Sequence, residues 1–328
     1  MSSGKPKVGV IGLGIMGGAM ALALLQEGYE VCGYDPAPAA RARLKKAGGK
    51  ALASATAVAA SAEIIITSLA TAAALADARG KIAAAVWPKD APRRIVIETS
   101  TLPIADKELA MAAWKKAGIT TLDCPISGTA VRMPERTWNI YVSGPQAAAK
   151  RVHPVLQVFT DIQPYVGVFG NGTKFKFAAN HLVAIYNVAY AESVTFARKM
   201  GLDAQQLYDL FAPSGVLGTG VMRLRMAFMA RREYTPPTMK VEVWQKDMQV
   251  IGDMAKSVHC PTPLFTACVP IYNAAMAQGL AGEDTASVAE VLGSMAGLAP
   301  KVKAKAKAKA KVKVKVKVKT KAKAKAKV

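Results

Sequence analysis

The sequence predicts a doubly wound α/β domain with a mostly parallel sheet, followed by an all-α domain and a lysine-rich tail. Three observations support this prediction. A β-branched run at 8–11 leads into a glycine-rich turn and a helix-forming stretch, strand and helix patterns then alternate, and helical periodicity dominates after residue 172. We expect the first domain at residues 1–172, the second at 173–299 and the tail at 300–328.

The glycine-rich turn lies between the strand pattern at 8–11 and the helical stretch at 19–26. It reads Gly12, Leu13, Gly14, Ile15, Met16 and Gly17. This order of strand, GxGxxG and helix is the context that a dinucleotide-binding turn requires. Gly12 permits the turn, Gly14 lets the backbone approach a pyrophosphate, and Gly17 lets helix and strand pack closely. We therefore expect these six residues to bind a dinucleotide.

The second strand, at 30–34, ends at Asp35, which lies 18 residues after Gly17. A carboxylate at this place can accept hydrogen bonds from the ribose hydroxyls, which favours NAD. Arg41 and Arg43 follow a few residues later and are able to reach a 2′-phosphate, although exposed positions on the next helix are the simpler explanation of both arginines. NAD is the predicted cofactor, and NADP remains the alternative.

The alternation continues with strands at 64–68 and 95–98 and a helix at 105–116. Carboxyl ends of parallel strands face the ligand crevice, so Ser68, Leu69 and the run ending in Thr101 are expected beside the cofactor. Ordinary turn chemistry is an equally good explanation of these residues. Segments 138–142 and 162–169 are expected to complete the sheet, with antiparallel pairing open to them.

A polar turn follows the strand that ends at 122–125. Ser127, Gly128 and Thr129 offer backbone amides and two hydroxyl groups that can hold a carboxylate. Hydroxyl-bearing turns are also common where no ligand binds. We carry these three residues forward as candidate substrate ligands.

A long helix is expected after Gly170 and Gly172, with Thr173 as a candidate cap. With 3.6 residues per turn, one face of this helix carries Lys176, Asn180, Val183 and Asn187, whereas Lys174 and His181 point elsewhere. Such a mixed face suits the wall of a cleft, although a single solvated lysine is also compatible with it. Helical patterns follow at about 175–200, 204–211, 221–230, 239–257, 264–278 and 285–295. Spacing alone favours a surface ion pair for Lys246 and Asp247.

The net charge of +22 is mostly a property of the tail, because 14 lysines lie between residues 301 and 327 and 22 − 14 leaves about +8. Lysine alternates there with small or apolar residues, which would place every lysine on one face of a strand, but repulsion among so many like charges predicts a disordered chain. A competing function is therefore a cofactor-binding protein without turnover that docks on nucleic acid or another polyanion through this tail. Non-specific polyanion binding also remains open beside a catalytic function.

The four cysteines are scattered without CxxC spacing, so neither a disulfide framework nor a metal site is expected. The apolar stretch at 8–25 contains five glycines, which counts against a signal peptide or a membrane span. A cytoplasmic location is the expectation.

Five motifs in order resemble the β-hydroxyacid dehydrogenase family, which includes 3-hydroxyisobutyrate, tartronate semialdehyde and threonate dehydrogenases. They are GLGIMGGAM, ETST, DCPISGT, GNGTKFKFAAN and WQKDM, and the resemblance spans about residues 7–296. It implies an N-terminal Rossmann domain, a helical C-terminal domain joined by a long helix, and NAD(P)-dependent oxidation of a small 3-hydroxy acid. It also implies homodimers or homotetramers.

The resemblance implies roles for individual residues. Lys176 matches the family's catalytic lysine, Asn180 its substrate-binding asparagine, and Ser127–Gly128 its carboxylate-binding turn. Thr101 falls near the nicotinamide, and Lys246 matches the lysine that closes over the site.

Three departures and distinctions bear on the substrate. Thr129 stands where the family turn more often reads SGG, which adds bulk and a hydroxyl group beside the expected carboxylate. Ala179–Asn180 lacks the histidine of the related 6-phosphogluconate dehydrogenases, which counts against a sugar phosphate. Imine reductases usually replace the lysine, so Lys176 favours carbonyl or alcohol chemistry.

Overall fold

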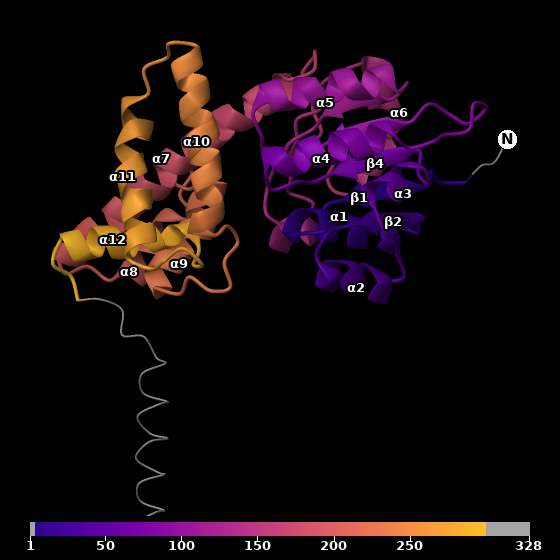
Figure 1. Cartoon of the computed structure of the whole chain (residues 1–328). Helices are drawn as coiled ribbons and strands as arrows, with labels where there is room; N and C mark the ends of the chain where they lie inside the picture. Colours follow the sequence, from indigo (N-terminus) through magenta and orange to yellow (C-terminus); the bar gives the residue numbers. More distant parts are fainter. Residues whose placement is uncertain (1–3, 300–328) are drawn as a thin grey trace, which may run out of the picture.

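The computed structural model describes residues 4–299. A domain built on a parallel sheet lies beside a cluster of helices, and the long helix α7 (Asn171–Lys199) runs from the first into the second (Figure 1). The predicted tail at 300–328 lies outside the described residues. The predicted boundary at residue 172 falls inside α7 and stays a prediction.

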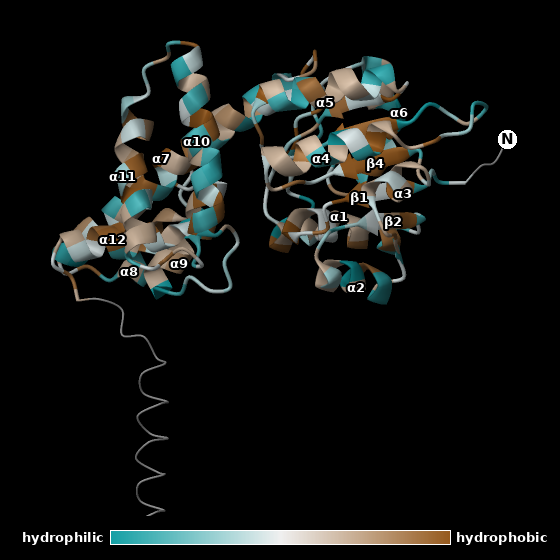
Figure 2. Ribbon diagram, viewed as in Figure 1, coloured by the Kyte–Doolittle hydropathy of each residue, from teal (hydrophilic) through white to brown (hydrophobic). Residues whose placement is uncertain are grey.

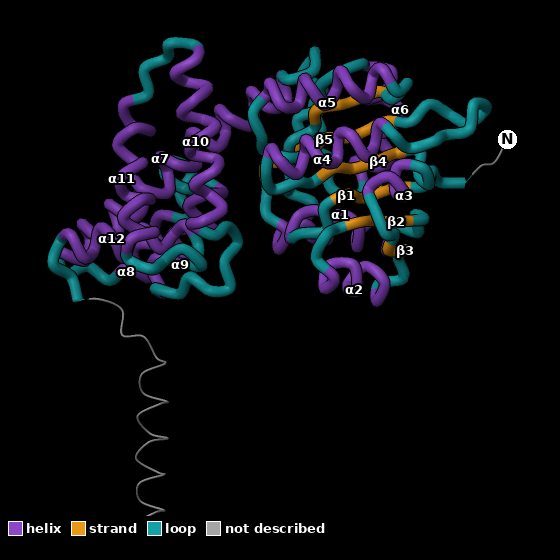
Figure 3. The backbone as a smooth tube through the Cα atoms, viewed as in Figure 1, coloured by secondary structure: helices purple, strands orange, loops and turns teal. Residues whose placement is uncertain are grey.

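The sheet has six parallel strands in the order β3-β2-β1-β4-β5-β6 (Figure 3). Their bounds are β1 Val8–Ile11, β2 Val31–Tyr34, β3 Lys50–Ala51, β4 Ile64–Thr67, β5 Ile95–Glu98 and β6 Thr120–Asp123. The strand order reverses between β1 and β4, where ligands bind in doubly wound sheets. The predicted Rossmann fold is therefore confirmed, and the strand β3 is an addition to it.

Helices cover both faces of the sheet: α1 Ile15–Gln26, α2 Pro38–Lys46, α3 Ala55–Ala59, α4 Ala72–Ala83, α5 Ile104–Lys116 and α6 Gln146–Gln157. Alternate residues of one strand enter two different cores. In β5, Ile95 and Ile97 pack into the core with α1 and α6, and Val96 packs into the core with α4 and α5. Because both faces are buried, β4 is apolar up to its last residue, Thr67, and β1 contains no polar side chain; the brown colour of this region shows it (Figure 2).

The prediction that 138–142 and 162–169 complete this sheet is wrong. Within the first segment, β8 (Asn139–Ile140) pairs antiparallel with β7 (Ile126–Ser127) in a separate two-stranded sheet. Segment 162–169 forms only isolated bridges, to Asn139 and Val142. Pro164 has no backbone N–H to donate, which interrupts any longer ladder there.

The second domain is helical, as predicted. Its elements are α8 Ala204–Phe211, α9 Gly220–Arg231, α10 Val241–Ser257, α11 Pro263–Ala277, the 3-10 turn η2 Thr285–Ser287 and α12 Val288–Met295. One core gathers apolar residues of α7, α9, α10, α11 and α12, with Met226 and Tyr272 among its buried members. The last predicted helix is thus divided into a 3-10 turn and α12. Among the helices at 4–299, none is long and apolar enough to cross a membrane.

Candidate active site

Each glycine of the GxGxxG turn has a different environment. A Cβ atom at Gly12 would lie 2.2 Å from the carbonyl oxygen of Ser68, and one at Gly17 would lie 1.9 Å from that of Gly12. These two glycines are fixed by close packing of the chain itself. A Cβ at Gly14 would meet no atom within 4 Å, so the backbone there borders open space. This is the arrangement that a pyrophosphate above the turn needs, and the turn fits a dinucleotide.

Asp35 lies beside this turn at the end of β2. Its Oδ2 accepts a hydrogen bond of 2.8 Å from the Leu13 backbone N–H, and its Oδ1 accepts one of 2.8 Å from Ala37. The carboxylate is therefore held in place with lone pairs still free for ribose hydroxyls. Arg41 is committed to backbone carbonyls of Asp35 and residue 36. Arg43 is exposed and lines a cavity of about 370 Å³ next to the glycine turn.

The other predicted cofactor residues lie at the carboxyl ends of β4 and β5. Ser68 packs against the turn, as the contact with Gly12 shows, and Leu69 donates its backbone N–H to Ser100 Oγ at 2.8 Å. The carbonyl oxygen of Thr101 accepts a hydrogen bond of 2.6 Å from Lys246 Nζ. The structure thus brings Ser68 and Leu69 next to the glycine turn, and Thr101 to the contact with the helical domain.

Lys176 lies on the first turns of α7 and is only 8% exposed. Burial lowers its pKa to about 8; nearby Asp247 opposes this shift and Lys246 adds to it. Within residues 4–299, the structure shows no hydrogen bond or ion pair to its Nζ. An ammonium group without a fixed partner in a desolvated place is suited to exchange a proton near neutral pH. Lys174 is exposed and points elsewhere, as predicted.

Asn180, one turn after Lys176, is buried and donates from Nδ2 to Asp247 Oδ2 at 2.8 Å. Asp247 also contacts Lys246, with 3.1 Å between Oδ1 and Nζ. The ion pair expected for these two residues forms, but the prediction that it lies on the surface is wrong for Asp247, which is only 4% exposed. The signal available in the sequence was the apolar face around Trp244, which turns the aspartate inward. Lys246 in turn reaches Thr101, so α7, α10 and the loop after β5 are joined by side chains.

Asn187 lies on the same face of α7 as Lys176 and is buried, but it belongs to the helical core. Its Nδ2 donates to Tyr272 Oη at 3.1 Å and to the carbonyl oxygen of Thr285 at 2.8 Å. The predicted polar face is therefore divided between the candidate site and the interior of the second domain.

The candidate substrate turn is shaped by Trp138. A Cβ at Gly128 would lie 2.3 Å from the indole Cδ1, and the indole Nε1 donates to the carbonyl oxygen of Thr129 at 2.8 Å. The Oγ1 atom of Thr129 is buried and has no hydrogen-bond partner among residues 4–299. Ser127 ends β7, and α7 packs against this strand. The turn is thus next to the helix that carries Lys176.

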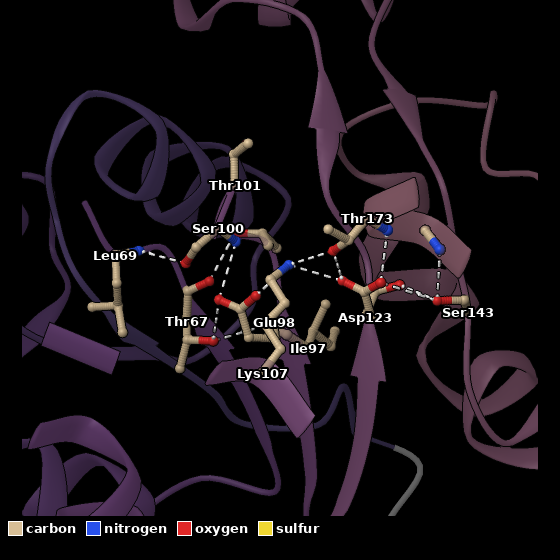
Figure 4. A network of polar contacts seen from close by, with 12 residues as sticks. Thr67, Leu69, Ile97, Glu98, Ser100, Thr101, Lys107, Asp123, Ser143 and Thr173 are labelled. Atoms are coloured by element: carbon tan, nitrogen blue, oxygen red, sulfur yellow. Dashed lines mark hydrogen bonds and ion pairs between the residues drawn. The ribbon is translucent and has the colours of Figure 1, made fainter. Parts of the chain in front are cut away.

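A buried network of ion pairs and hydrogen bonds around Lys107, next to the site, was not predicted (Figure 4). Lys107 is 1% exposed, and its Nζ lies 2.7 Å from Glu98 Oε2, 2.8 Å from Asp123 Oδ1 and 2.9 Å from Thr173 Oγ1. Burial alone would lower the pKa of Lys107, but the charges of Glu98 and Asp123 outweigh it and raise this pKa. Thr173 is not the helix cap, which is Gly170; it donates its backbone N–H and its hydroxyl to Asp123.

One signal for this network was present in the sequence. Lys107, Ala110 and Trp114 follow helical spacing, and all three are buried on one face of α5. A lysine on an apolar face requires a buried counter-ion. The partners come from strand ends that lie together only in the folded sheet, so the sequence pattern alone could not identify them.

The comparisons with known proteins identify the family. Residues 7–169 match the model of the NAD binding domain of 6-phosphogluconate dehydrogenase, and residues 170–292 match the model described as NAD-binding of NADP-dependent 3-hydroxyisobutyrate dehydrogenase. The chain is 29% identical over 289 residues to an L-threonate dehydrogenase of Cupriavidus necator, covering 87% of this chain and 95% of that protein. It is 30% identical over 203 residues to a probable 3-hydroxyisobutyrate dehydrogenase of Mycobacterium bovis, covering 62% and 68%.

A solved structure of a 3-hydroxyisobutyrate dehydrogenase from Salmonella typhimurium superposes with a TM-score of 0.78 at 27% identity, covering 88% of this chain and all of that chain. The first family model covers the sheet domain and the second the helical domain, and the matches to the Cupriavidus necator enzyme and to the solved structure cover 87% and 88% of this chain. The chain therefore belongs to the β-hydroxyacid dehydrogenase family of NAD(P)-dependent oxidoreductases, as its five motifs predicted.

Proposed function

We propose that this protein transfers a hydride between NAD and a small 3-hydroxy acid, or the corresponding semialdehyde or keto form, with Lys176 as the general acid and base. The observation that carries the proposal is a buried lysine with a pKa of about 8 and no fixed partner within residues 4–299. It lies on the helix that packs against the candidate carboxylate turn. The names of the relatives support the substrate class, since they are threonate and 3-hydroxyisobutyrate dehydrogenases.

The proton has to leave the alcohol when the hydride leaves its carbon, and a base within hydrogen-bond reach makes this possible. When bound, the nicotinamide ring supplies the hydride acceptor. With a pKa of about 8, roughly a tenth of Lys176 is neutral at pH 7, whereas an ordinary lysine is neutral in well under one part in a thousand. The neutral amine takes the hydroxyl proton, and the ammonium form returns it in the reverse direction.

Asn180 and the turn at 127–129 would orient the substrate. Asp247 occupies one N–H of the Asn180 amide, which leaves the second N–H and the carbonyl oxygen for the reacting hydroxyl. The backbone amides of Ser127, Gly128 and Thr129 would hold the carboxylate, with the turn fixed by Trp138. Lys246, through its bond to Thr101, would keep the two domains together around the substrate.

We propose NAD as the preferred cofactor because Asp35 is held at the end of β2 by two backbone N–H groups. Its charge would attract ribose hydroxyl donors and repel a 2′-phosphate. NADP is the alternative, through Arg43 at the edge of the cavity beside the glycine turn. Arg41 supports NADP less, since its Nη1 donates to two backbone carbonyls at 2.6 and 3.0 Å, whereas Arg43 makes one longer bond of 3.4 Å from Nη2 to the Leu13 carbonyl.

The experiment is a substrate screen with matched controls. The full chain is mixed with NAD or NADP and with a panel of 3-hydroxy acids that carry no 2-hydroxyl, including 3-hydroxyisobutyrate, and absorbance at 340 nm is followed. The 2-hydroxy isomers and the Lys176→Ala variant serve as controls. Turnover confined to 3-hydroxy acids and lost in the variant is the expected result. Equal turnover of the 2-hydroxy isomers, or no turnover with any 3-hydroxy acid, would contradict the proposal.

Three further points belong to this proposal. We infer a homodimer or homotetramer from family resemblance, which sedimentation of the full chain would test. The predicted cytoplasmic location stays a prediction.

Non-specific polyanion binding through the lysine-rich tail is compatible with the dehydrogenase and is a separate property of a segment outside residues 4–299. The docking protein without turnover is not favoured, since both family models and the relatives support the enzyme.

A further inference from the structure

Two carboxylates meet at the carboxyl edge of the sheet. Glu98 and Asp123 are register partners on the adjacent strands β5 and β6, and both are 0% exposed. Lys107 of α5 places its Nζ between them, at 2.7 and 2.8 Å. Two like charges side by side in the interior are tolerated only with such a cation. Lys107 therefore bridges the two strand ends through their carboxylates.

Asp123 connects this ion cluster to α7, the helix that carries Lys176. Its two carboxylate oxygens accept the backbone N–H and the hydroxyl of Thr173 at 2.7 Å each. The carboxylate thereby binds a free N–H of the first turn of α7, where a negative charge is favourable. A Cβ on Gly172 would lie 2.7 Å from the Asp123 carbonyl oxygen, so this turn also touches the strand directly. Thr173 lies three residues before Lys176, about 4.5 Å along the helix and close to the same face.

Glu98 connects the cluster to the cofactor side. Its Oε1 accepts the backbone N–H of Ser100 at 3.0 Å, and Ser100 Oγ accepts the backbone N–H of Leu69 at 2.8 Å. The next residue, Thr101, holds Lys246. A chain of hydrogen bonds and ion pairs thus runs from the loops beside the glycine turn, through Lys107, to the first turn of α7 (Figure 4).

We propose that Lys107 is a positioning residue, which fixes the first turn of α7 against the cofactor-side loops and so sets where Lys176 stands relative to the nicotinamide. This inference rests on the proposed function of Lys176. A buried ion cluster is a weak means of stabilisation, because apolar residues of similar volume often serve as well. It is directional, however, and fixes atoms to a few tenths of an ångström, which hydride transfer requires.

The test compares two variants with a matched control. Lys107→Met removes the cation, and Thr173→Val removes only the hydroxyl between Lys107 and Asp123 while keeping the volume. The control is Arg94→Met. Arg94 is 4% exposed and precedes β5 at the opposite end of the strand from Glu98, where it donates to the carbonyl oxygens of Ala59 and Ala85. The Arg94→Met variant therefore removes a buried cation beside the same sheet without changing any residue of the network around Lys107.

Four quantities are compared at a temperature where each variant is folded: kcat, the Kd for NAD, the primary isotope effect and amide hydrogen exchange; thermal stability is measured separately. We expect kcat to fall roughly 10- to 100-fold in Lys107→Met and less in Thr173→Val, with the Kd for NAD changed by less than about threefold. The primary isotope effect with substrate deuterated at the carbinol carbon should rise, because hydride transfer becomes slower than the other steps. Amide hydrogen exchange at residues 172–176 should accelerate in both variants. Arg94→Met should lose thermal stability and keep wild-type kcat, isotope effect and exchange at these residues.

The outcomes separate this inference from the function on which it rests. If wild type turns over a 3-hydroxy acid and Lys107→Met keeps its kcat and isotope effect, the positioning role is wrong and the function stands. If Lys107→Met does not fold, Thr173→Val decides by the same measurements. If wild type turns over no hydroxy acid, the proposed function fails, and amide hydrogen exchange alone tests whether Lys107 fixes the first turn of α7. Unchanged protection of the amides at 172–176 in the variants overturns that role, and lost protection supports it. If kcat falls as far in Arg94→Met as in Lys107→Met, the fall reflects a general loss of stability, and the positioning role is wrong.

Discussion

Asn180 on α7 donates a 2.8 Å hydrogen bond to Asp247 on α10, and both side chains are buried. Through this bond the helix that carries the proposed catalytic lysine is joined to Lys246, which reaches across to the carbonyl oxygen of Thr101 in the sheet domain. Asp247 is also the nearby anion that limits how far the pKa of Lys176 falls. One carboxylate therefore holds a candidate substrate ligand and tunes the candidate base.

Replacing Lys176 with alanine should abolish most turnover and leave cofactor binding intact. General acid and base catalysis contributes about 10²- to 10⁴-fold, so kcat should fall by this amount. NAD affinity, measured by fluorescence titration, should stay within about threefold of wild type, because the glycine turn and Asp35 are unchanged. The control is Lys174→Ala, which removes an exposed lysine two residues away on the same helix. Near wild-type turnover in Lys176→Ala would assign the proton transfer to another group.

Oxidation of the hydroxy acid should accelerate as pH rises, with a midpoint near 8. The proposed base acts in its neutral form, and burial lowers the pKa of Lys176 to about 8. The reverse reaction needs the ammonium form, so its rate should decline over the same range. Initial rates in both directions between pH 6 and 9.5 test this prediction. A flat profile of kcat/KM in both directions would show that Lys176 does not titrate in the rate-determining step.

Wild type should prefer NAD, and Asp35→Ala should lose that preference. The carboxylate would accept charge-assisted hydrogen bonds from the ribose hydroxyls, and hydrogen bonds to charged groups contribute about 1.5–3 kcal/mol. We expect roughly a 10- to 100-fold loss in kcat/KM for NAD and a smaller change for NADP. Arg43→Ala is the matched variant, and it should leave the NAD reaction unchanged. Wild-type preference for NADP, lost in Arg43→Ala, would instead make this arginine the reader of the 2′-phosphate.

The lysine-rich tail should contribute to polyanion binding and not to turnover. A chain ending at Pro300 loses 14 positive charges and should keep its activity. Retention of the full chain on double-stranded DNA should fall steeply with salt, because binding releases condensed counterions. Equal retention of both chains would place the binding in residues 1–300, and loss of activity on truncation would give the tail a catalytic role.

The sequence was sufficient for those parts of the fold that rest on local patterns. The strand before GxGxxG, the acid after β2 and the helical periodicity beyond residue 172 each follow from residues close together in the chain. Pairing of distant segments was less accessible: segment 162–169 has strand-like composition, but Pro164 and its irregular partners reduce it to isolated bridges. The roles of side chains were hardest to predict where they depend on tertiary contacts.

Lys246–Asp247 and Lys107 illustrate that limit. Both lysines lie next to acidic residues in helices, where an exposed pair is the common outcome. Asp247 is buried because α10 faces α7 there, and Lys107 is buried because two strand ends present carboxylates to it. The roles proposed for Lys176, Asn180 and the turn at 127–129 depended on family resemblance as well as on spacing. These roles stay proposals, although the first two residues are buried as a site requires.

Lys176→Met should make the protein more stable while it removes activity. An ammonium with a pKa of about 8 in the folded state and 10.5 when unfolded binds fewer protons folded than unfolded between these values. Stability therefore rises with pH through this window, and below about pH 8 the burial of the charged lysine costs roughly 3 kcal/mol. Methionine keeps the apolar stem without the charge, so the variant avoids this cost.

The prediction is tested by urea unfolding of wild type and Lys176→Met across pH 6 to 9.5. The free energy of unfolding of the variant should exceed that of wild type by roughly 1–3 kcal/mol at pH 7, and the difference should shrink as pH approaches 9.5. Lys174→Met, at an exposed position, should show no such pH-dependent difference. A difference that stays constant with pH would mean that Lys176 keeps an ordinary pKa in the folded protein, and the case for it as the base would then lose its electrostatic support.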